Sequence, residues 1–383
     1  MMQTVLFITP LTHEACKDPL NGVRRYCKTR RWQLQVIEEV SASTDFDAIL
    51  ELWRPVGIIA ACGAWFPEPK PIEKLFGSVP FVALDRDPAP GGSFRCLTVA
   101  QDNAATGREA ARVMLSLGLR HYAYAGNHAV REWDTTRRDA YRKALKVHGF
   151  GCELFPGAGK GMADYPSRLA RWLPTLPRPV GVFCANDWVA DRVIGICNRL
   201  GLGIPRDCAV LGVDNDELIC EHTNPPLTSI APDFERGGYL AAELLDRKIA
   251  NPSLKPTCVR FSPILTVRRA STAGAGCTDA AVAVAVQMIR TRFADDIGVD
   301  DVAAVMGCSR RFAQSRFRDV VGKSIRDAIS EARMDRAFML LRRPNQAIGS
   351  IASLCGFGTD ANLRRIFRLR TGMSLSAWRA RNI

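Results

Sequence analysis

The sequence predicts an α/β region in residues 1–270 and an all-α region with two helix-turn-helix motifs near its end. Apolar, strand-like runs alternate with amphipathic helical stretches in the first region. In the second, one pattern of helix, glycine, capping residue and helix occurs twice. Basic residues are concentrated in the same segment. These three observations predict a ligand-binding region joined to a nucleic-acid-binding region.

The α/β prediction depends on how the strand-like runs are separated. The expected strands are Val5–Ile8, Gly57–Ala61, Phe81–Leu84, His121–Ala125, Val180–Cys184 and Ala209–Val213. The expected helices are Pro19–Arg31, Asn103–Leu117, Thr135–His148, Tyr165–Leu173, Asp187–Leu200 and Phe234–Ile249. Continuous apolar strands separated by helices indicate parallel sheets that are covered on both faces.

Polar residues that follow these strands are the candidate ligand contacts, because ligands of such folds bind beyond the carboxyl ends of the strands. Asp85 follows the third run, Asn186 the fifth and Asp214 the sixth, while Arg137 or Arg138 opens the helix after Gly126. Asp187, next to Asn186, is expected to cap the helix that begins at Trp188.

The repeated pattern lies in residues 297–379. Each copy has a short apolar helix that ends at a glycine, Gly307 or Gly356, and a second helix that restarts under a Ser309 or Thr359 cap. This combination is typical of a helix-turn-helix motif. Residues 324–341 join the copies as one helix of roughly 27 Å. Because successive major-groove faces lie roughly 34 Å apart, such a helix can present both motifs to one side of a duplex.

Periodicity separates the inner and outer faces of the two recognition helices. Ala313, Phe317 and Val320 of the first are expected to pack inward, as are Leu363, Ile366 and Phe367 of the second. The expected DNA-binding residues are Arg310, Arg311, Gln314, Ser315, Asp360, Asn362, Arg364, Arg365 and Arg368. Of these, Arg311, Gln314 and Arg365 are expected at base edges, and Arg364 and Arg368 at phosphates.

The charge distribution supports DNA as the partner of this segment. Residues 277–383 hold 18 Lys and Arg against 10 Asp and Glu, which is +8 of the net +13 for the whole chain. Only Lys323 among those basic residues is a lysine. Arginine forks bind phosphates and guanine edges better than ammonium groups do. An ordinary helical bundle with a charged face would leave the repeat and its matched caps unexplained.

The last hundred residues resemble the DNA-binding domain of the AraC/XylS family of transcription regulators. The resemblance runs from near Ala285 to Arg379 and is most specific in G-F-G-T-D-A-N-L-R-R-I-F-R-L-R-T-G-M-S-L-S-A-W-R at residues 356–379. Leu375 departs from the family, which normally has proline at that position.

The first region also resembles a known family. The motifs F-C-A-N-D-W-V-A-D-R-V-I (183–194), I-P-R-D-C-A-V-L-G-V-D-N-D-E (204–217) and P-P-L-T-S-I-A-P-D-F-E-R-G-G-Y-L-A-A-E-L-L (225–245) are similar to those of LacI-type and periplasmic sugar-binding proteins. The resemblance implies a type I periplasmic-binding-protein-like domain, with two α/β lobes joined by three crossovers and a sugar between them. Together, the two resemblances imply the arrangement of the xylose-operon regulator family.

The resemblance also implies which residues bind the sugar. Arg137, Asn186 and Asp214 match positions that hydrogen-bond sugar hydroxyls, and Asp85 matches a further polar contact. A sugar site also needs an aromatic platform. Trp65, Trp133 and Trp188 each lie near a strand end and are candidates for it, although each can equally be a half-buried structural tryptophan.

The expected organisation is an effector domain at 1–270, a linker rich in small residues at 271–280 and a DNA-binding domain at 281–383. We expect a homodimer that binds double-stranded DNA and a sugar effector, with RNA polymerase as a further candidate partner. The thirteen cysteines show no zinc spacing, and no secretory signal or membrane span is expected. The cytoplasm is therefore the expected location, and neither a metal nor a cofactor is expected.

Three alternatives remain open at this point. A sugar-modifying α/β enzyme fused to a DNA-binding domain is disfavoured, because the P-loop, nucleophile-elbow and zinc-protease motifs do not occur. An exported binding protein would have no use for the basic domain. A regulator of the same architecture that senses a ligand other than a sugar remains compatible with the residues. The identity of a sugar effector stays undetermined, and xylose is the first candidate by resemblance alone.

Overall fold

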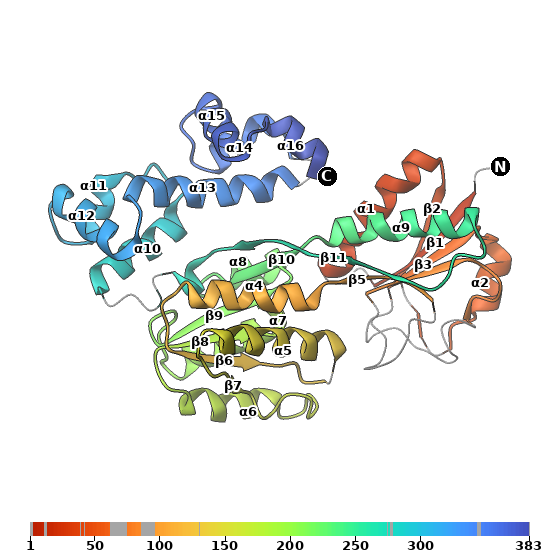
Figure 1. Ribbon diagram of the computed structural model, residues 1–383, viewed down its shortest axis with the longest axis horizontal. Helices are drawn as coiled ribbons and strands as arrows, with labels where there is room; N and C mark the ends of the chain where they lie inside the picture. The colour runs from red at the N-terminus through yellow and green to blue at the C-terminus, as the bar shows by residue number, and fades with distance from the viewer. Residues whose placement is uncertain are drawn as a thin grey trace. The chain divides into compact units, whose positions relative to one another are not determined.

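The computed structural model describes residues 3–10, 14–38, 40–41, 43–61, 75–85, 96–129, 131–273, 275, 279–342 and 346–382 (Figure 1). The chain divides into two compact units. The first comprises residues 1–108, 130–140 and 231–265, and the second comprises 109–129, 141–230 and 266–383. Trp65 and residues 274 and 276–278 of the predicted linker lie outside the described residues. The predicted boundaries of the effector domain, the linker and the DNA-binding domain stay predictions.

The first unit is built on a six-stranded sheet in the order β11-β5-β4-β3-β1-β2. Its strands are β1 (Thr4–Ile8), β2 (Gln33–Ile37), β3 (Gly57–Ala61), β4 (Phe81–Leu84), β5 (Leu97–Gln101) and β11 (Cys258–Phe261). All five neighbouring pairs are parallel. β3 and β5 are buried along their whole length, as expected for strands covered on both faces.

Helices α1 (Glu14–Arg30), α2 (Phe46–Trp53) and α9 (Phe234–Ala250) also belong to this unit. α1 and α9 are in backbone contact, which glycine alone permits. A Cβ atom on Gly22 would lie 1.9 Å from the carbonyl oxygen of Glu235, and one on Gly238 would lie 1.9 Å from that of Pro19. Val23 and Leu245 belong to the apolar core that these helices share with β1, β3 and β5.

The sheet of the second unit has the order β12-β10-β9-β8-β6-β7. Its strands are β6 (His121–Ala125), β7 (Glu153–Leu154), β8 (Val180–Cys184), β9 (Cys208–Val213), β10 (Thr228–Pro232) and β12 (Pro263–Val267). The accompanying helices are α4 (Asn103–Leu115), α5 (Glu132–Val147), α6 (Tyr165–Trp172), α7 (Asp187–Arg199) and α8 (Glu217–His222). α4, α5, β10 and β12 continue from one unit into the other. Two α/β sheets are thus confirmed.

The C-terminal part of the second unit is all-helical. Its helices are α10 (Ala280–Arg292), α11 (Val299–Val305), α12 (Arg310–Val321), α13 (Ile325–Arg342), α14 (Ile348–Leu354), α15 (Asp360–Thr371) and α16 (Leu375–Asn382). α11–α12 and α14–α15 are the two predicted motifs, and α13 is the predicted connecting helix. Each motif has its own apolar core, with Phe317 fully buried in the first and Phe367 in the second.

Two details of the helical part differ from the expectation or refine it. Val320 was expected to pack inward but is 43 % exposed, because the following residue, Val321, is the one that packs against the core of Ala313 and Phe317. Leu375, the departure from the family pattern, begins α16 and is buried in the second core beside Phe367. Among the described residues, no helix is long and apolar enough to cross a membrane.

Candidate ligand-binding and DNA-binding sites

In the first unit, Arg137 is fixed by the end of β5. Its Nε donates to Oδ1 of Asn103 at 2.9 Å, and Nη2 donates to Oε1 of Gln101 at 2.7 Å. Gln101 is held in turn, because its Nε2 donates to the Thr106 hydroxyl at 3.0 Å. The guanidinium lies 4.8 Å from the ring centroid of Trp133. A planar fork with two fixed amide partners and an aromatic neighbour is pre-oriented for directional hydrogen bonding.

Asp85 stands at the carboxyl end of β4 in the same unit. Its backbone has a φ of +57°, a left-handed conformation that non-glycine residues rarely adopt. Its N–H donates to the carbonyl of Val99 at 2.7 Å, and its side chain is exposed. Asp85, Arg137 and Trp133 therefore belong to one unit, whereas the other described candidates belong to the second.

In the second unit, the cap of α7 differs from the expectation. The side-chain oxygen of Asn186 accepts from the N–H of Val189 at 3.1 Å, so Asn186 is the N-cap and Asp187 is the first helical residue. The expectation that Asp187 caps the helix was therefore wrong by one position. The cap occupies Oδ1 of Asn186 and leaves its NH₂ group to donate to a ligand.

Asp187 is instead the centre of a buried polar cluster. Its carboxyl group accepts from the Ser229 hydroxyl at 2.6 Å, from the N–H of Asp216 at 2.9 Å and from the Cys220 thiol at 3.3 Å. Gly212 provides the space, since a Cβ there would lie 2.1 Å from Oδ1 of Asp187. Burial, and secondarily the charge of Asp214, raises the pKa of Asp187 to about 8.

The turn that follows β9, next to this cluster, is strained. Asp214 has a φ of +108° and Asn215 a φ of +53°. Such conformations cost on the order of 1–3 kcal/mol each and concentrate at functional sites. The N–H of Asn215 donates to the Ser229 hydroxyl at 3.0 Å, so the buried cluster holds the turn in this conformation.

Trp188 is half-buried in the first turn of α7. The guanidinium of Arg192 lies 3.3 Å from its ring centroid, and the rings of His128 and Tyr165 lie at 5.2 and 5.9 Å. The ring face under Arg192 is therefore occupied, and only the remaining surface of Trp188 can contact a ligand.

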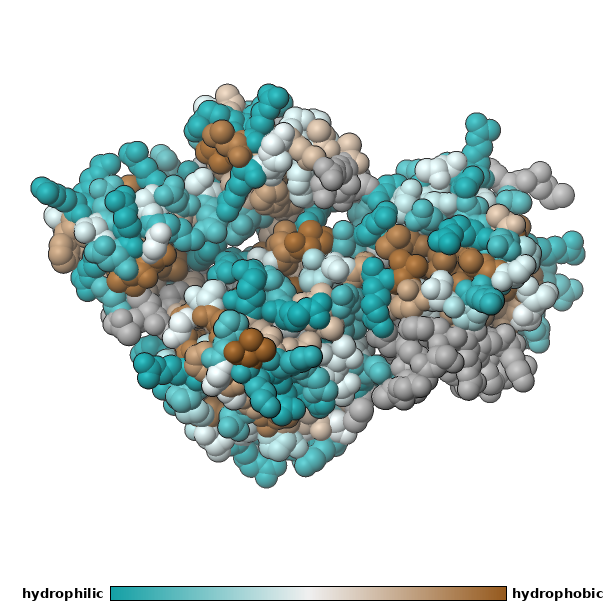
Figure 2. Space-filling view, in the orientation of Figure 1, coloured by the Kyte–Doolittle hydropathy of each residue, from teal (hydrophilic) through white to brown (hydrophobic). Residues whose placement is uncertain are grey.

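The DNA-binding candidates lie on the outer faces of α12 and α15. Figure 2 shows mostly hydrophilic side chains over these helices, with a few apolar residues among them. Arg311, Arg365 and Arg368 are exposed, as the periodicity predicted. Arg310 pairs with Asp300 at 2.8 Å, and the hydroxyl of Ser315 lies 3.4 Å from Asp319.

The first turn of α15 carries its own polar contacts. Arg364 pairs with Asp360 at 2.7 Å, and Nη2 of Arg365 donates to Oδ1 of Asn362 at 3.2 Å. These exposed contacts are weak and can be exchanged for phosphates or base edges. Gln314 of α12 is partly buried. Phe312 of α12, which is 55 % exposed, is a surface residue that periodicity did not identify.

Comparisons with known proteins find two matching domains in the chain. Residues 111–272 match the model of a periplasmic binding protein-like domain, and residues 302–381 match that of a helix-turn-helix domain. The chain is 27% identical to the xylose operon regulatory protein of Escherichia coli K12 over 366 residues, which is 92% of this chain and 90% of the relative. It is 27% identical to the ribose operon repressor of the same strain over 69% of this chain and 80% of that relative.

A solved structure titled as the xylose-binding transcription activator XylR has the same fold over 99% of this chain and 98% of its own, with a TM-score of 0.62 and 24% identity. The two matched domains and their order define a DNA-binding transcription regulator and not an enzyme. Within that class, the chain is similar to regulators of the XylR type in having a periplasmic-binding-protein-like domain before a C-terminal helix-turn-helix domain.

Proposed function

We propose that this chain is a sugar-responsive transcription regulator that controls genes of sugar catabolism. A monosaccharide would bind beyond the carboxyl ends of the strands, and Asp85, Arg137, Asn186 and Asp214 are its candidate polar contacts. Trp133 and Trp188 are the candidate platform, together with Trp65. Arg311, Gln314 and Arg365 would contact base edges.

The observation that carries the proposal is the support of Arg137 by Gln101 and Asn103 beside Trp133. A sugar presents several hydroxyls, each of which needs a donor or an acceptor, and an apolar ring face that packs on an aromatic side chain. A fixed guanidinium next to an indole supplies both. The strained Asp214–Asn215 turn adds a carboxylate held at a defined position.

Xylose is our first candidate because the relative with 92% coverage is named for the xylose operon, and ribose is the second for the corresponding reason. We also propose that the protein acts in the cytoplasm as a homodimer, since two copies fit a symmetric operator. As an activator it would contact RNA polymerase. Sugar can change DNA affinity only by binding one conformational state more tightly than the other.

A thermal-shift panel of pentoses and hexoses tests the sugar assignment, because a ligand that binds only the native state raises the melting temperature. At 100 times its dissociation constant, a sugar should add about 2.7 kcal/mol of stability. Amino acids and nucleosides serve as the non-sugar arm. A thermal shift in that arm alone would show that the effector is not a sugar. Failure of the purified protein to retain any duplex DNA at low ionic strength would refute the proposal that it is a DNA-binding regulator.

A further inference from the structure

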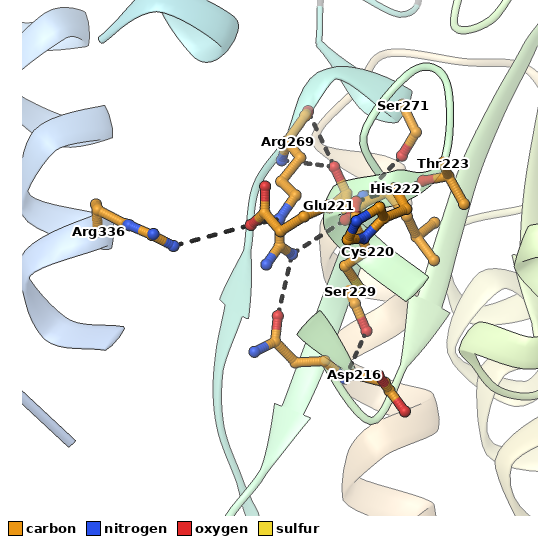
Figure 3. A network of polar contacts seen from close by, with 12 residues as sticks. Asp216, Cys220, Glu221, His222, Thr223, Ser229, Arg269, Ser271 and Arg336 are labelled. Carbon is orange, nitrogen blue, oxygen red and sulfur yellow. Dashed lines mark hydrogen bonds and ion pairs between the residues drawn. The ribbon is translucent and has the colours of Figure 1, made fainter. Parts of the chain in front are cut away.

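We propose that Arg269 and Glu221 form a polar relay from the Asp214–Asn215 turn to α13, the helix that joins the two helix-turn-helix motifs. The inference rests on the proposed function, since the turn is where a sugar is proposed to bind. All the residues involved belong to the second unit. Figure 3 shows the arrangement, with Arg269 beside Glu221 and Arg336 of α13 pointing toward Glu221.

Arg269 is the anchor of the relay. It is only 6 % exposed, and its Nη1 donates to Oδ1 of Asn215 and to the carbonyl of Leu227, both at 3.0 Å. Its own N–H donates to the Thr228 hydroxyl at 2.8 Å. Because a buried guanidinium stays charged and requires partners, its position follows that of its acceptors. Arg269 is therefore placed to respond to a movement of Asn215.

Hydrogen bonds connect the Asp214–Asn215 turn to Ser229 and Asp187. The N–H of Asn215 donates to the Ser229 hydroxyl at 3.0 Å, and that hydroxyl donates to Asp187 at 2.6 Å. The left-handed conformations of Asp214 and Asn215 are maintained by these contacts. A sugar that binds Asp214 would therefore shift its neighbour Asn215, whose Oδ1 is an acceptor of Arg269.

Glu221 carries the relay to the DNA-binding part. Its Oε1 accepts from Nε of Arg269 at 3.0 Å and lies 3.8 Å from Nη1 of Arg336. The side chains of Glu221 and Arg336 are 44% and 29% exposed, so solvent weakens the attraction between them. A weak contact suits a relay, because a stronger one would lock one state.

The neighbouring residue makes a parallel connection. Arg268 is partly buried near Arg290 of α10 and near Glu331 and Asp335 of α13; burial, and secondarily the charge of Arg290, lowers its pKa. Arg290 pairs with Asp335 at 3.3 Å. Arg268 thus interacts with the helical part directly, whereas Arg269 is connected to it through Glu221.

α13 can transmit a displacement to both motifs. Glu331 pairs with Lys323, which follows α12, and lies 3.7 Å from Arg370 of α15. One side chain of α13 therefore contacts residues next to each recognition helix. A shift of α13 relative to Glu221 would change how both helices are presented to a duplex.

The test uses the full chain and the variants Glu221→Gln and Arg336→Gln, with Arg326→Gln as the matched control, because Arg326 is an exposed arginine on α13. Hydrogen exchange of residues 325–342 is measured with and without D-xylose and D-ribose. Sugar affinity is measured on the same samples. The reciprocal arm adds a duplex selected from a random pool and follows exchange in residues 208–222, because coupling between two binding events acts equally in both directions.

Both relay variants should keep sugar affinity within about twofold and lose most of the sugar-dependent change in 325–342, whereas Arg326→Gln should match the parent. If sugar binds the parent but exchange in 325–342 does not respond, or responds equally in the variants, the relay is wrong and the proposed function stands. If no sugar binds, the sugar assignment fails, and the duplex arm decides the relay: a response of residues 208–222 that both variants lose supports it, and any other result overturns it.

Discussion

Ser309 and Thr359 perform the same structural role at the start of α12 and of α15. The Ser309 hydroxyl accepts from the N–H of Phe312 at 3.4 Å, and that of Thr359 accepts from the N–H of Asn362 at 3.2 Å. Each follows a glycine in the left-handed region, Gly307 at a φ of +64° and Gly356 at +73°. Gly356 has a second constraint, since a Cβ there would lie 2.7 Å from the carbonyl oxygen of Phe293.

The first prediction concerns these caps. Ser309→Ala and Thr359→Ala should each lower stability by about 1 kcal/mol, because each leaves one N–H at a helix start without its acceptor. The urea midpoint followed by helical circular dichroism measures the loss. Ser376→Ala, at an exposed position of α16, is the control and should change little. An equal loss in the control, or none at the caps, would show that these hydroxyls do not support the recognition helices.

The second prediction distinguishes two arginines of α15. Arg365→Ala should cost roughly 1–3 kcal/mol of DNA binding and relax the preference at one base pair, whereas Arg368→Ala should weaken all duplexes alike and lower the salt slope by about 1. Both side chains are exposed, and Arg365 already contacts Asn362. Competition among duplexes that differ at one base pair measures the difference.

A uniform loss with Arg365→Ala would reassign that residue to a phosphate contact. A loss confined to one base pair with Arg368→Ala would do the reverse. Arg342→Ala is unsuitable as a control, because this guanidinium lies 5.6 Å from the ring of Trp378 and supports packing. Arg326→Ala, on the exposed face of α13, is the appropriate one.

The elements were predictable from the sequence because their signals are local. The run Val180–Cys184 coincides with β8, and the cap of α15 follows from Thr359 alone. The buried cluster of the second unit was not predictable in this way. Asp187 looked like a helix cap, yet its partner Ser229 is distant in the chain, and the space for it is created by Gly212. Such contacts depend on which strands become neighbours in the sheet, which no short motif encodes.

In the candidate site, too, the sequence identified single residues but not the partners that they contact in the fold. Arg137 could be named from the resemblance, but its partners could not, because Gln101 ends β5 and Asn103 follows it, and apolar periodicity did not detect that strand. Arg269 was not identified from the sequence, although it is nearly buried against Thr228 and Asn215.

The third prediction tests the guanidinium fork. Arg137→Lys keeps the charge but cannot satisfy Gln101 and Asn103 together, so the sugar-induced thermal shift should largely disappear. Hydrogen bonds that involve a charged group are worth about 1.5–3 kcal/mol, which corresponds to roughly a 10- to 100-fold loss of affinity. Arg138→Lys is the matched control, because Arg138 pairs with its neighbour Asp139 at 2.8 Å. If Arg138→Lys abolishes the shift and Arg137→Lys does not, the wrong arginine has been assigned.

Asp187 provides the fourth prediction, which concerns pH. Burial, and secondarily the charge of Asp214, raises its pKa from the ordinary 3.8 to about 8, while the donors Ser229, Cys220 and the N–H of Asp216 oppose that rise. The folded chain therefore holds a proton that the unfolded chain has lost between about pH 4 and pH 8. Because the folded state binds the extra proton, this residue makes stability fall as the pH rises through that window.

Asp187→Asn should remove this dependence, because the amide stays neutral at every pH and its oxygen can still accept from the N–H of Asp216. The parent should lose up to about 1.4 kcal/mol per pH unit relative to the variant within the window, with no further divergence above it. Urea unfolding at a series of pH values measures both proteins. Asp191→Asn, an exposed position on the same helix, should follow the parent. Parallel curves for the parent and Asp187→Asn would mean that the three donors keep the buried carboxylate ionised, and the turn would then rest on a charge at neutral pH.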